Sequence, residues 1–221
     1  MELLRGRDGL TGRDGVQGPP GPSGKDGSPG PPGPKSGGGI YTRWGKSTCP
    51  QVEDTEIVYS GITGGTLFSQ EGGGANYLCM PKDPEYSTEL KYQGGVQGAA
   101  SIYGAEYQNP LQGSHDHNVP CAVCYVSTRP TVIMIPAKAS CPSSWTREYY
   151  GYIMTAFRGR QNNFIVGRTM FECVDKDQES LPGSYANTDG VIFFHVEASC
   201  NGLPCPPYNP NKELNCVVCT K

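Results

Sequence analysis

The sequence predicts a short triple-helical stem followed by a mainly-β, disulfide-rich globular domain built from two tandem repeats. Three observations predict this architecture. Glycine recurs at every third position near the N-terminus, all ten cysteines lie in the remainder of the chain, and their pattern occurs twice. We expect a Gly-X-Y segment at 1–35, a glycine-rich hinge at 36–39 and a globular head at 40–221.

The stem carries an uninterrupted glycine period, at positions 6, 9, 12, 15, 18, 21, 24, 27, 30 and 33. In a triple helix of polyproline-II chains, every third residue lies at the common axis, where only glycine fits. A flexible linker has no physical reason to keep this period. The pattern is therefore typical of a short collagen triple helix, which ends where Ser36 breaks the register.

Four stem residues are candidates for hydroxylation. Pro20, Pro29 and Pro32 occupy the third triplet position, where hydroxyproline stabilises a triple helix, and Lys35 is the lysine at that position. So few prolines at this position predict a weak trimer. Tethering the three chains would strengthen it, and we expect the globular head to supply that tether.

The composition excludes some partners and favours an oxidising compartment. A formal net charge of −3 argues against nucleic acid or an anionic membrane as the main partner. No run approaches the roughly 20 apolar residues of a membrane span. Ten cysteines beside a collagen stem predict an oxidising, extracellular compartment. Because the first five residues contain no apolar signal region, we expect this sequence to be a fragment.

The head contains several short apolar runs bounded by Gly, Pro, Asn or Ser, and no stretch has a helical period. These features predict a mainly-β fold with long loops. The candidate strands cover residues 40–45, 56–59, 124–126, 131–135, 152–154, 163–166 and 191–196.

Three landmarks of the head occur twice, in the same order. A Cys-Pro pair at Cys49 recurs at Cys141, a Cys-x-x-Lys-Asp-x-Glu segment at Cys79 recurs at Cys173, and a Cys-x-Val-Cys segment at 121–124 recurs at 216–219. Such nearly constant offsets indicate a tandem duplication with halves at about 49–124 and 141–219.

The two Cys-x-x-Cys units raise the alternatives of a zinc site or a redox dithiol. They lie too far apart for a zinc ribbon, and no thioredoxin-like context surrounds them, so structural disulfides are favoured. The repeat predicts that Cys49 and Cys79 pair with Cys121 and Cys124, and that Cys141 and Cys173 pair with Cys216 and Cys219, in a crossed or nested order that stays open. Cys200 and Cys205 remain, and they are close enough to form a small loop.

The halves, each beginning with Cys-Pro and ending with Cys-x-Val-Cys, resemble the C-terminal non-collagenous domain of type IV collagen. A closer resemblance is to the short-chain, spongin-type collagens of invertebrates. The segments that carry it lie at 41–45, 72–79, 102–107, 135–138 and 203–208. The resemblance covers essentially the whole head.

The resemblance implies an extracellular-matrix structural protein whose head drives trimer formation, with homotrimers or heterotrimers of related chains and other matrix proteins as partners. It also implies nested disulfides, Cys49–Cys124, Cys79–Cys121, Cys141–Cys219, Cys173–Cys216 and Cys200–Cys205. The first half has no counterpart of Cys200 and Cys205, so the resemblance does not extend to the head-to-head hexamer and the Met-to-hydroxylysine crosslinks of type IV collagen.

Other candidate sites are weaker. His115, Asp116 and His117 could bind a metal, but loop residues surround them, and His195 lies in an apolar run typical of a packed histidine. We predict no catalytic residues, no metal site and no cofactor, hence no enzyme. The alternative function is a collagen-stalked recognition protein that binds a ligand multivalently through its heads.

Overall fold

The computed structural model describes residues 9–30, 37–69, 73–86, 100–108, 113–156, 160–161, 164–165 and 169–221. Contacts divide the chain into two compact units, Met1–Pro34 and Lys35–Lys221. This division falls next to the predicted end of the Gly-X-Y segment, and each unit is described by itself below.

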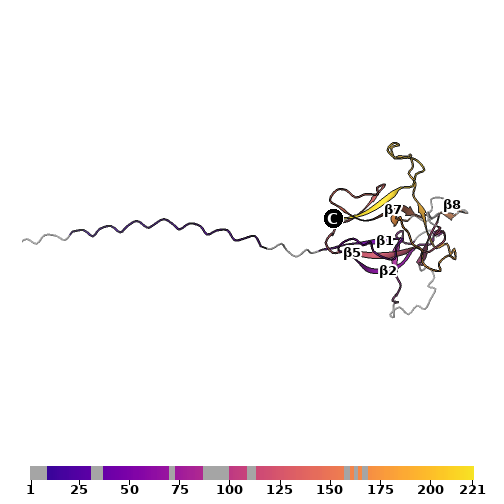
Figure 1. Cartoon of the computed structure of the whole chain (residues 1–221), viewed down its shortest axis with the longest axis horizontal. Helices are drawn as coiled ribbons and strands as arrows, with labels where there is room; N and C mark the ends of the chain where they lie inside the picture. The colour runs from indigo at the N-terminus through magenta and orange to yellow at the C-terminus, as the bar shows by residue number, and fades with distance from the viewer. Residues whose placement is uncertain are drawn as a thin grey trace, which may run out of the picture. The chain divides into compact units, whose positions relative to one another are not determined.

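In the first unit, residues 9–30 run as an extended, fully exposed chain without sheet partners (Figure 1). A Cβ atom added at any described glycine from Gly9 to Gly30 would meet no other atom within 4 Å. Within residues 9–30 of this chain, nothing therefore requires glycine on steric grounds. Pro20 and Pro29 are exposed, whereas Pro32 and Lys35 lie outside the described residues. The triple helix itself needs three chains and stays a prediction.

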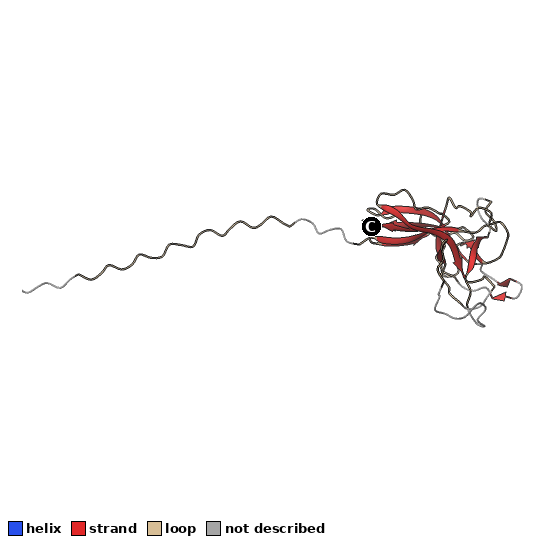
Figure 2. Cartoon of the chain, turned by 90° about the horizontal axis from the view of Figure 1, so that it is seen from below, coloured by secondary structure: helices blue, strands red, loops and turns tan. Residues whose placement is uncertain are grey.

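The second unit is built from strands, and no helix occurs among its described residues (Figure 2). The strands of the first half are β1 (Gly39–Trp44), β2 (Thr55–Gly65), β3 (Leu78–Pro81), β4 (Tyr103–Tyr107) and β5 (Pro120–Val126). Those of the second half are β6 (Val132–Pro136), β7 (Thr146–Thr155), β8 (Arg160–Gln161), β9 (Phe164–Ile165), β10 (Glu172–Asp175), β11 (Val191–His195) and β12 (Asn215–Thr220). A mainly-β head is therefore confirmed.

The main sheet closes on itself. Its strand order is β10-β1-β5-β2-β4-β11-β7-β12-β6, with β3 paired to β2, and a further pairing of β10 with β7 completes a ring. In Figure 1, β1, β2 and β5 lie side by side at one part of the head. Closure leaves β3 and β6 as strands with a single partner each.

The two halves use equivalent strand pairings. In the first half β5 lies between β1 and β2, and β2 also pairs with β3 and β4. In the second half β12 lies between β6 and β7, and β7 also pairs with β10 and β11. The β2–β5 pair and the β7–β12 pair carry a register shift at equivalent places. In β2 it lies between Ile57 and Tyr59, and in β7 it lies between Arg147 and Tyr149. The duplication read from the cysteines thus extends to the sheet.

Every predicted strand overlaps an observed one, although residues 163 and 166 lie outside the described part of the chain. The strands that were not predicted are β3, β4, β8, β10 and β12. Four of them contain cysteine, glycine or charged residues among the apolar ones, which weakens the alternating pattern.

Two apolar clusters form the core, and each contains residues of both halves. One is centred on Trp44, Tyr77, Tyr107, Val174 and Phe193, with Tyr77 stacked on Phe193 at 4.1 Å between ring centroids. The other includes Tyr41, Cys124, Tyr149, Cys173 and Cys216. Because the clusters cross the boundary between the halves, the head folds as one unit.

Two glycines of the predicted hinge are packed against the head. Gly39 begins β1, and a Cβ on it would lie 2.6 Å from the side chain of Val132. A Cβ on Gly38 would lie 2.2 Å from the ring of Tyr125. The hinge prediction therefore extends too far along the chain, since these glycines allow close approach of the backbone to neighbouring side chains.

Among the described residues, no helix is long and apolar enough to cross a membrane.

Candidate functional site

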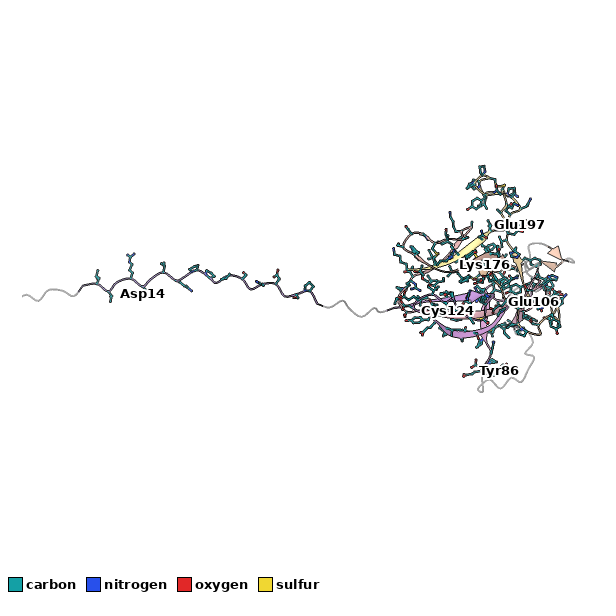
Figure 3. All side chains as sticks on the ribbon, viewed as in Figure 1. Asp14, Tyr86, Glu106, Cys124, Lys176 and Glu197 are labelled. Atoms are coloured by element: carbon teal, nitrogen blue, oxygen red, sulfur yellow. A yellow bond between two sulfur atoms is a disulfide. The ribbon has the colours of Figure 1, made fainter. Side chains whose placement is uncertain are left out.

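All ten cysteines lie in described residues and form five disulfides. The pairs are Cys49–Cys124, Cys79–Cys121, Cys141–Cys219, Cys173–Cys216 and Cys200–Cys205, with Cα–Cα distances of 5.6–5.9 Å. Figure 3 places Cys124 among the packed side chains of the head. The order that the resemblance implies is therefore the observed one.

The nested order follows from the geometry of a strand. Cys121 and Cys124 are three residues apart in β5, so their side chains point to opposite faces of the sheet. Cys121 packs in the cluster around Trp44, and Cys124 packs in the cluster around Tyr41. Each face thus receives one disulfide.

Glycine is required beside these disulfides. Gly61 of β2 lies between the two strands that Cys79 and Cys121 join, and a Cβ on it would lie 2.1 Å from the Met80 oxygen. Gly151 occupies the equivalent place in β7, where a Cβ would lie 1.7 Å from the Val174 oxygen. Any larger residue at either position would separate the paired strands.

A series of polar contacts lies where the two halves meet, and we call it the inter-half junction. On one side it contains β1 and the residues up to Ser47. On the other it contains β7, β10 and the residues up to Glu179.

Glu148 of β7 is the most enclosed charged group of the junction, because its side chain is fully buried. Its carboxylate accepts hydrogen bonds from Tyr41 Oη at 3.0 Å, Thr55 Oγ1 at 3.2 Å and Thr220 Oγ1 at 2.6 Å. Arg129 Nη2 lies 3.1 Å away and supplies the compensating charge. A buried carboxylate needs such partners, so the network joins both halves and the segment between them.

Two tyrosines complete this part of the junction. Tyr149 donates its hydroxyl toward the oxygens of Cys173 at 2.9 Å and Thr42 at 3.2 Å, and its ring lies 6.1 Å from that of Tyr41. Burial raises the pKa of both hydroxyls well above the usual range, and for Tyr41 the neighbouring Glu148 carboxylate adds to this effect. Both phenols are therefore neutral donors at ordinary pH.

Further along β1, Arg43 and Trp44 contact β10. The guanidinium of Arg43 forms a two-bonded ion pair with Asp175, at 2.7 and 2.9 Å. Trp44 Nε1 donates to Glu172 Oε2 at 2.9 Å. Burial raises the pKa of Glu172 to about 7, although the bond from Trp44 acts in the opposite direction.

The last contact of the junction joins Lys46 to Glu179, at 3.0 Å. The same carboxylate accepts the backbone N–H and the hydroxyl of Ser47, and Glu179 N donates to the Gly45 oxygen at 2.7 Å. Although partial burial raises the pKa of Glu179, these hydrogen bonds and the Lys46 charge outweigh it and lower the pKa. The junction thus runs from Glu148 to Glu179 as a continuous polar contact.

Local sequence patterns do not predict the junction, because the contacts that β1 and the residues after it make with the second half join side chains 107 to 133 residues apart. One signal was present in the repeats. Glu85 and Glu179 end the duplicated Lys-Asp-x-Glu segments, and Lys46 and Lys138 follow equivalent strands. Of these repeated charged residues, Lys46 and Glu179 are the ones that meet in the junction.

Glu106, labelled in Figure 3, is another buried carboxylate. It accepts the backbone N–H groups of Thr188 at 3.0 Å and Asp189 at 3.2 Å, together with the Thr188 hydroxyl. These bonds tie the loop before β11 to β4, so its role in the described structure is to hold that loop.

The histidines singled out in the sequence lie in different settings. His115, Asp116 and His117 lie in a loop, where His117 Nδ1 contacts the His115 oxygen at 2.9 Å and His115 Nε2 lies 3.5 Å from Asp116. His195 in β11 packs edge-on against Tyr152, at 5.4 Å between ring centroids, and burial lowers its pKa. No cluster of three or more metal-ligating side chains occurs in the described residues.

A small hollow of about 110 Å³ lies beside β11, lined by residues that include Phe68, Ala75, Thr169, Val191 and Ile192. Ligand pockets usually measure about 300–1,000 Å³, so this hollow is too small for most organic ligands. The hollow and the junction share no lining residue.

Comparison with known proteins gives no match: no family model matches the chain, and no curated protein resembles it in sequence.

Proposed function

We propose that this protein is a secreted, structural collagen of the extracellular matrix, whose C-terminal head brings three chains together and thereby nucleates the stem. The expected family is that of the short-chain, spongin-type collagens. Other chains of the same or a related kind are the partners, with Pro20, Pro29, Pro32 and Lys35 as substrates for hydroxylation.

The single observation that carries the proposal is the unexplained glycine period. Glycine occurs at every third position from 6 to 33, yet side chains at the described stem glycines would meet no atom of the chain. Glycine also costs conformational entropy relative to other residues, so a period without a contact would bring no advantage. Contacts with two further chains at a common axis supply the missing reason.

The head supports the same proposal through its disulfides. Five disulfides in 187 residues, Lys35–Lys221, are typical of proteins that fold in an oxidising compartment. A rigid, disulfide-bonded domain next to a weak stem is suited to raising the local concentration of the stem chains. The alternative of a collagen-stalked recognition protein stays a prediction, because no contact in the described residues favours it.

Protection of the stem from trypsin tests the proposal. Trypsin cleaves after lysine and arginine, so Arg13 and Lys25 report on the stem. We expect the full chain, secreted from cells that hydroxylate proline, to resist cleavage at both sites in the cold. Gly18→Ala, which places a side chain at the axis, should restore cleavage.

The matched control is Gln17→Ala, which alters the neighbouring third-position residue and leaves the glycine period intact. It should stay protected. Rapid cleavage of the unaltered chain at Arg13 and Lys25, with the head intact, would contradict the proposed triple helix.

A further inference from the structure

The duplication allows each residue of the junction to be matched with its counterpart in the other half. Trp44 of β1 and Pro136 of β6 are equivalent, because they pair opposite Cys121 and Cys216. In the same way, Gly61 of β2 matches Gly151 of β7, and Cys79 of β3 matches Cys173 of β10. These matches extend along each strand.

The inter-half junction uses β1 of the first half and β7 with β10 of the second half. The equivalent strands on the other side of each half are β6 and β2 with β3. Within the chain, β6 pairs only with β12, and β3 pairs only with β2. The chain therefore carries both surfaces of a second junction, and it does not bring them together.

The first pair of counterparts is apolar. Tyr41 and Glu148, which contact each other in the junction, correspond to Ile133 and Val58. Val58 is 56% exposed, whereas Glu148 is buried. Val58 stands at the position of the buried carboxylate Glu148, and Ile133 stands at the position of its hydrogen-bond donor Tyr41. The polar pair of the junction is therefore matched by an apolar pair.

The second pair is apolar as well. Tyr149 and Thr42, joined by a hydrogen bond in the junction, correspond to Tyr59 and Met134. Tyr149 is 5% exposed, while its counterpart Tyr59 is 37% exposed and Met134 is 38% exposed. The hydroxyl of Tyr59 donates to the Cys79 oxygen at 2.9 Å, as that of Tyr149 does to the Cys173 oxygen.

The third pair again exchanges a polar contact for an apolar one. Trp44 donates to Glu172 in the junction, and the equivalent positions hold Pro136 and Leu78. Both are exposed, Leu78 by 40%. The parallel pairing of β1 with β10 corresponds to a pairing of β6 with β3, whose outer edges have no strand partner in the described head.

The last pair keeps its charges. Lys46 and Glu179 form the ion pair that ends the junction, and their counterparts are Lys138 and Glu85. Lys138 and Glu85 are both exposed, and neither forms an ion pair within the described residues. Tyr86, next to Glu85, projects at the outer edge of the head in Figure 3 and is 83% exposed.

We propose that the β6 surface of one head (Ile133, Met134, Pro136 and Lys138) packs on the β2–β3 surface (Val58, Tyr59, Leu78 and Glu85) of a second copy of this chain. The contact repeats the arrangement of the inter-half junction, with an apolar centre and a Lys138–Glu85 ion pair at its end. The inference rests on the proposed function, and it names the surfaces through which the heads associate.

Charge and apolar complementarity identify the occupant as another copy. Every residue of the β6 surface has its chemical match on the β2–β3 surface of the same chain, so one sequence supplies both partners. Because the two surfaces differ, the contact is heterologous and generates a ring when its rotation closes. Three chains joined through one stem require such a ring to close at three.

Charge reversal tests this contact. The full chain is studied by sedimentation at a temperature at which the circular-dichroism band of the stem is lost and the head is folded. Lys138→Glu or Glu85→Lys alone places like charges together and should raise the concentration of half-dissociation about tenfold or more. The double variant should return it to within about threefold of the unaltered chain.

Lys212→Glu and Glu197→Lys reverse exposed charges outside the two surfaces, and they should leave association unchanged. Val58→Asp should abolish the trimer, whereas Leu203→Asp, at an exposed loop position, should not. If the variants of the two surfaces form the trimer as well as these controls do, the inference is overturned and the proposed function stands. A full chain that is monomeric under every condition would overturn both.

Discussion

At the scale of single residues, the head depends on buried carboxylates whose charge is satisfied in different ways. Glu148 has Arg129 as its ion-pair partner, while the contact found for Glu172 among the described residues is the neutral donor Trp44 Nε1. A buried carboxyl group without a cation is more stable when protonated. This is the physical reason for the raised pKa of Glu172, about 7.

Glu172→Gln should therefore change the pH dependence of stability. The unfolded state loses the Glu172 proton near its ordinary pKa of 4.5, and the folded state retains it up to about 7. Unaltered protein is thus fully stabilised below about pH 4.5 and loses stability as the pH rises to about 7. At pH 8 the Glu172→Gln variant should unfold at a temperature a few degrees higher than the unaltered protein. The buried charge of Glu172 lowers the free energy of unfolding of the unaltered protein by on the order of 2 kcal/mol at this pH, and the variant lacks that charge.

Thermal unfolding followed by near-UV circular dichroism between pH 4 and 8 measures this effect. Glu197→Gln, an exposed carboxyl group, is the control and should follow the unaltered protein. Equal slopes for Glu172→Gln and the unaltered protein would show that Glu172 does not remain protonated in the fold.

The repeated cysteine landmarks sorted the cysteines into pairing groups, and the resemblance implied their nested order. The two faces of β5 supply the physical reason for that order. The junction residues were harder to foresee. Arg43 and Asp175, for example, are 132 residues apart, and nothing in either neighbourhood indicates the other. Contacts between distant segments depend on the closure of the sheet, which local sequence patterns do not encode.

At the scale of strands, the predicted elements are those with uninterrupted β-branched and aromatic residues, such as β6 and β11. β4 was missed because its sequence, Tyr-Gly-Ala-Glu-Tyr, contains a glycine and a carboxylate. Glu106 is buried there and bonded to the loop at 188–189, so tertiary contacts replace intrinsic strand preference.

The disulfides should contribute unequally to stability. Cys79–Cys121 joins β3 to β5 and closes a loop of 42 residues, whereas Cys200–Cys205 closes a loop of 5. The chain-entropy model assigns about 4 kcal/mol to the former and about 2 kcal/mol to the latter. Replacing both members of each pair with alanine should reproduce this order in denaturant unfolding.

Cys121 is also fully buried, so its replacement adds a packing loss that the exposed Cys200–Cys205 loop does not have. The difference in the free energy of unfolding between the two double variants should therefore be at least as large as the chain-entropy model gives. Equal losses in the free energy of unfolding of the two double variants would contradict the predicted order.

At the scale of the whole molecule, we propose different roles for the stem and the head. In this proposal three chains meet at the stem glycines, and the head associates through the exposed apolar residues of β2, β3 and β6. Such exposed apolar residues on adjacent strands are typical of association surfaces. Assembly is therefore expected to begin in the head and to proceed into the stem.

The mass of the head by itself tests this claim most directly. Lys35–Lys221 is a compact unit, and it retains Gly38 and Gly39, which pack against Tyr125 and Val132. Secreted without the stem and measured in solution with its disulfides intact, this unit should have three times the mass of one chain. A stable, correctly disulfide-bonded monomer at micromolar concentration would contradict the claim that the head drives trimer formation.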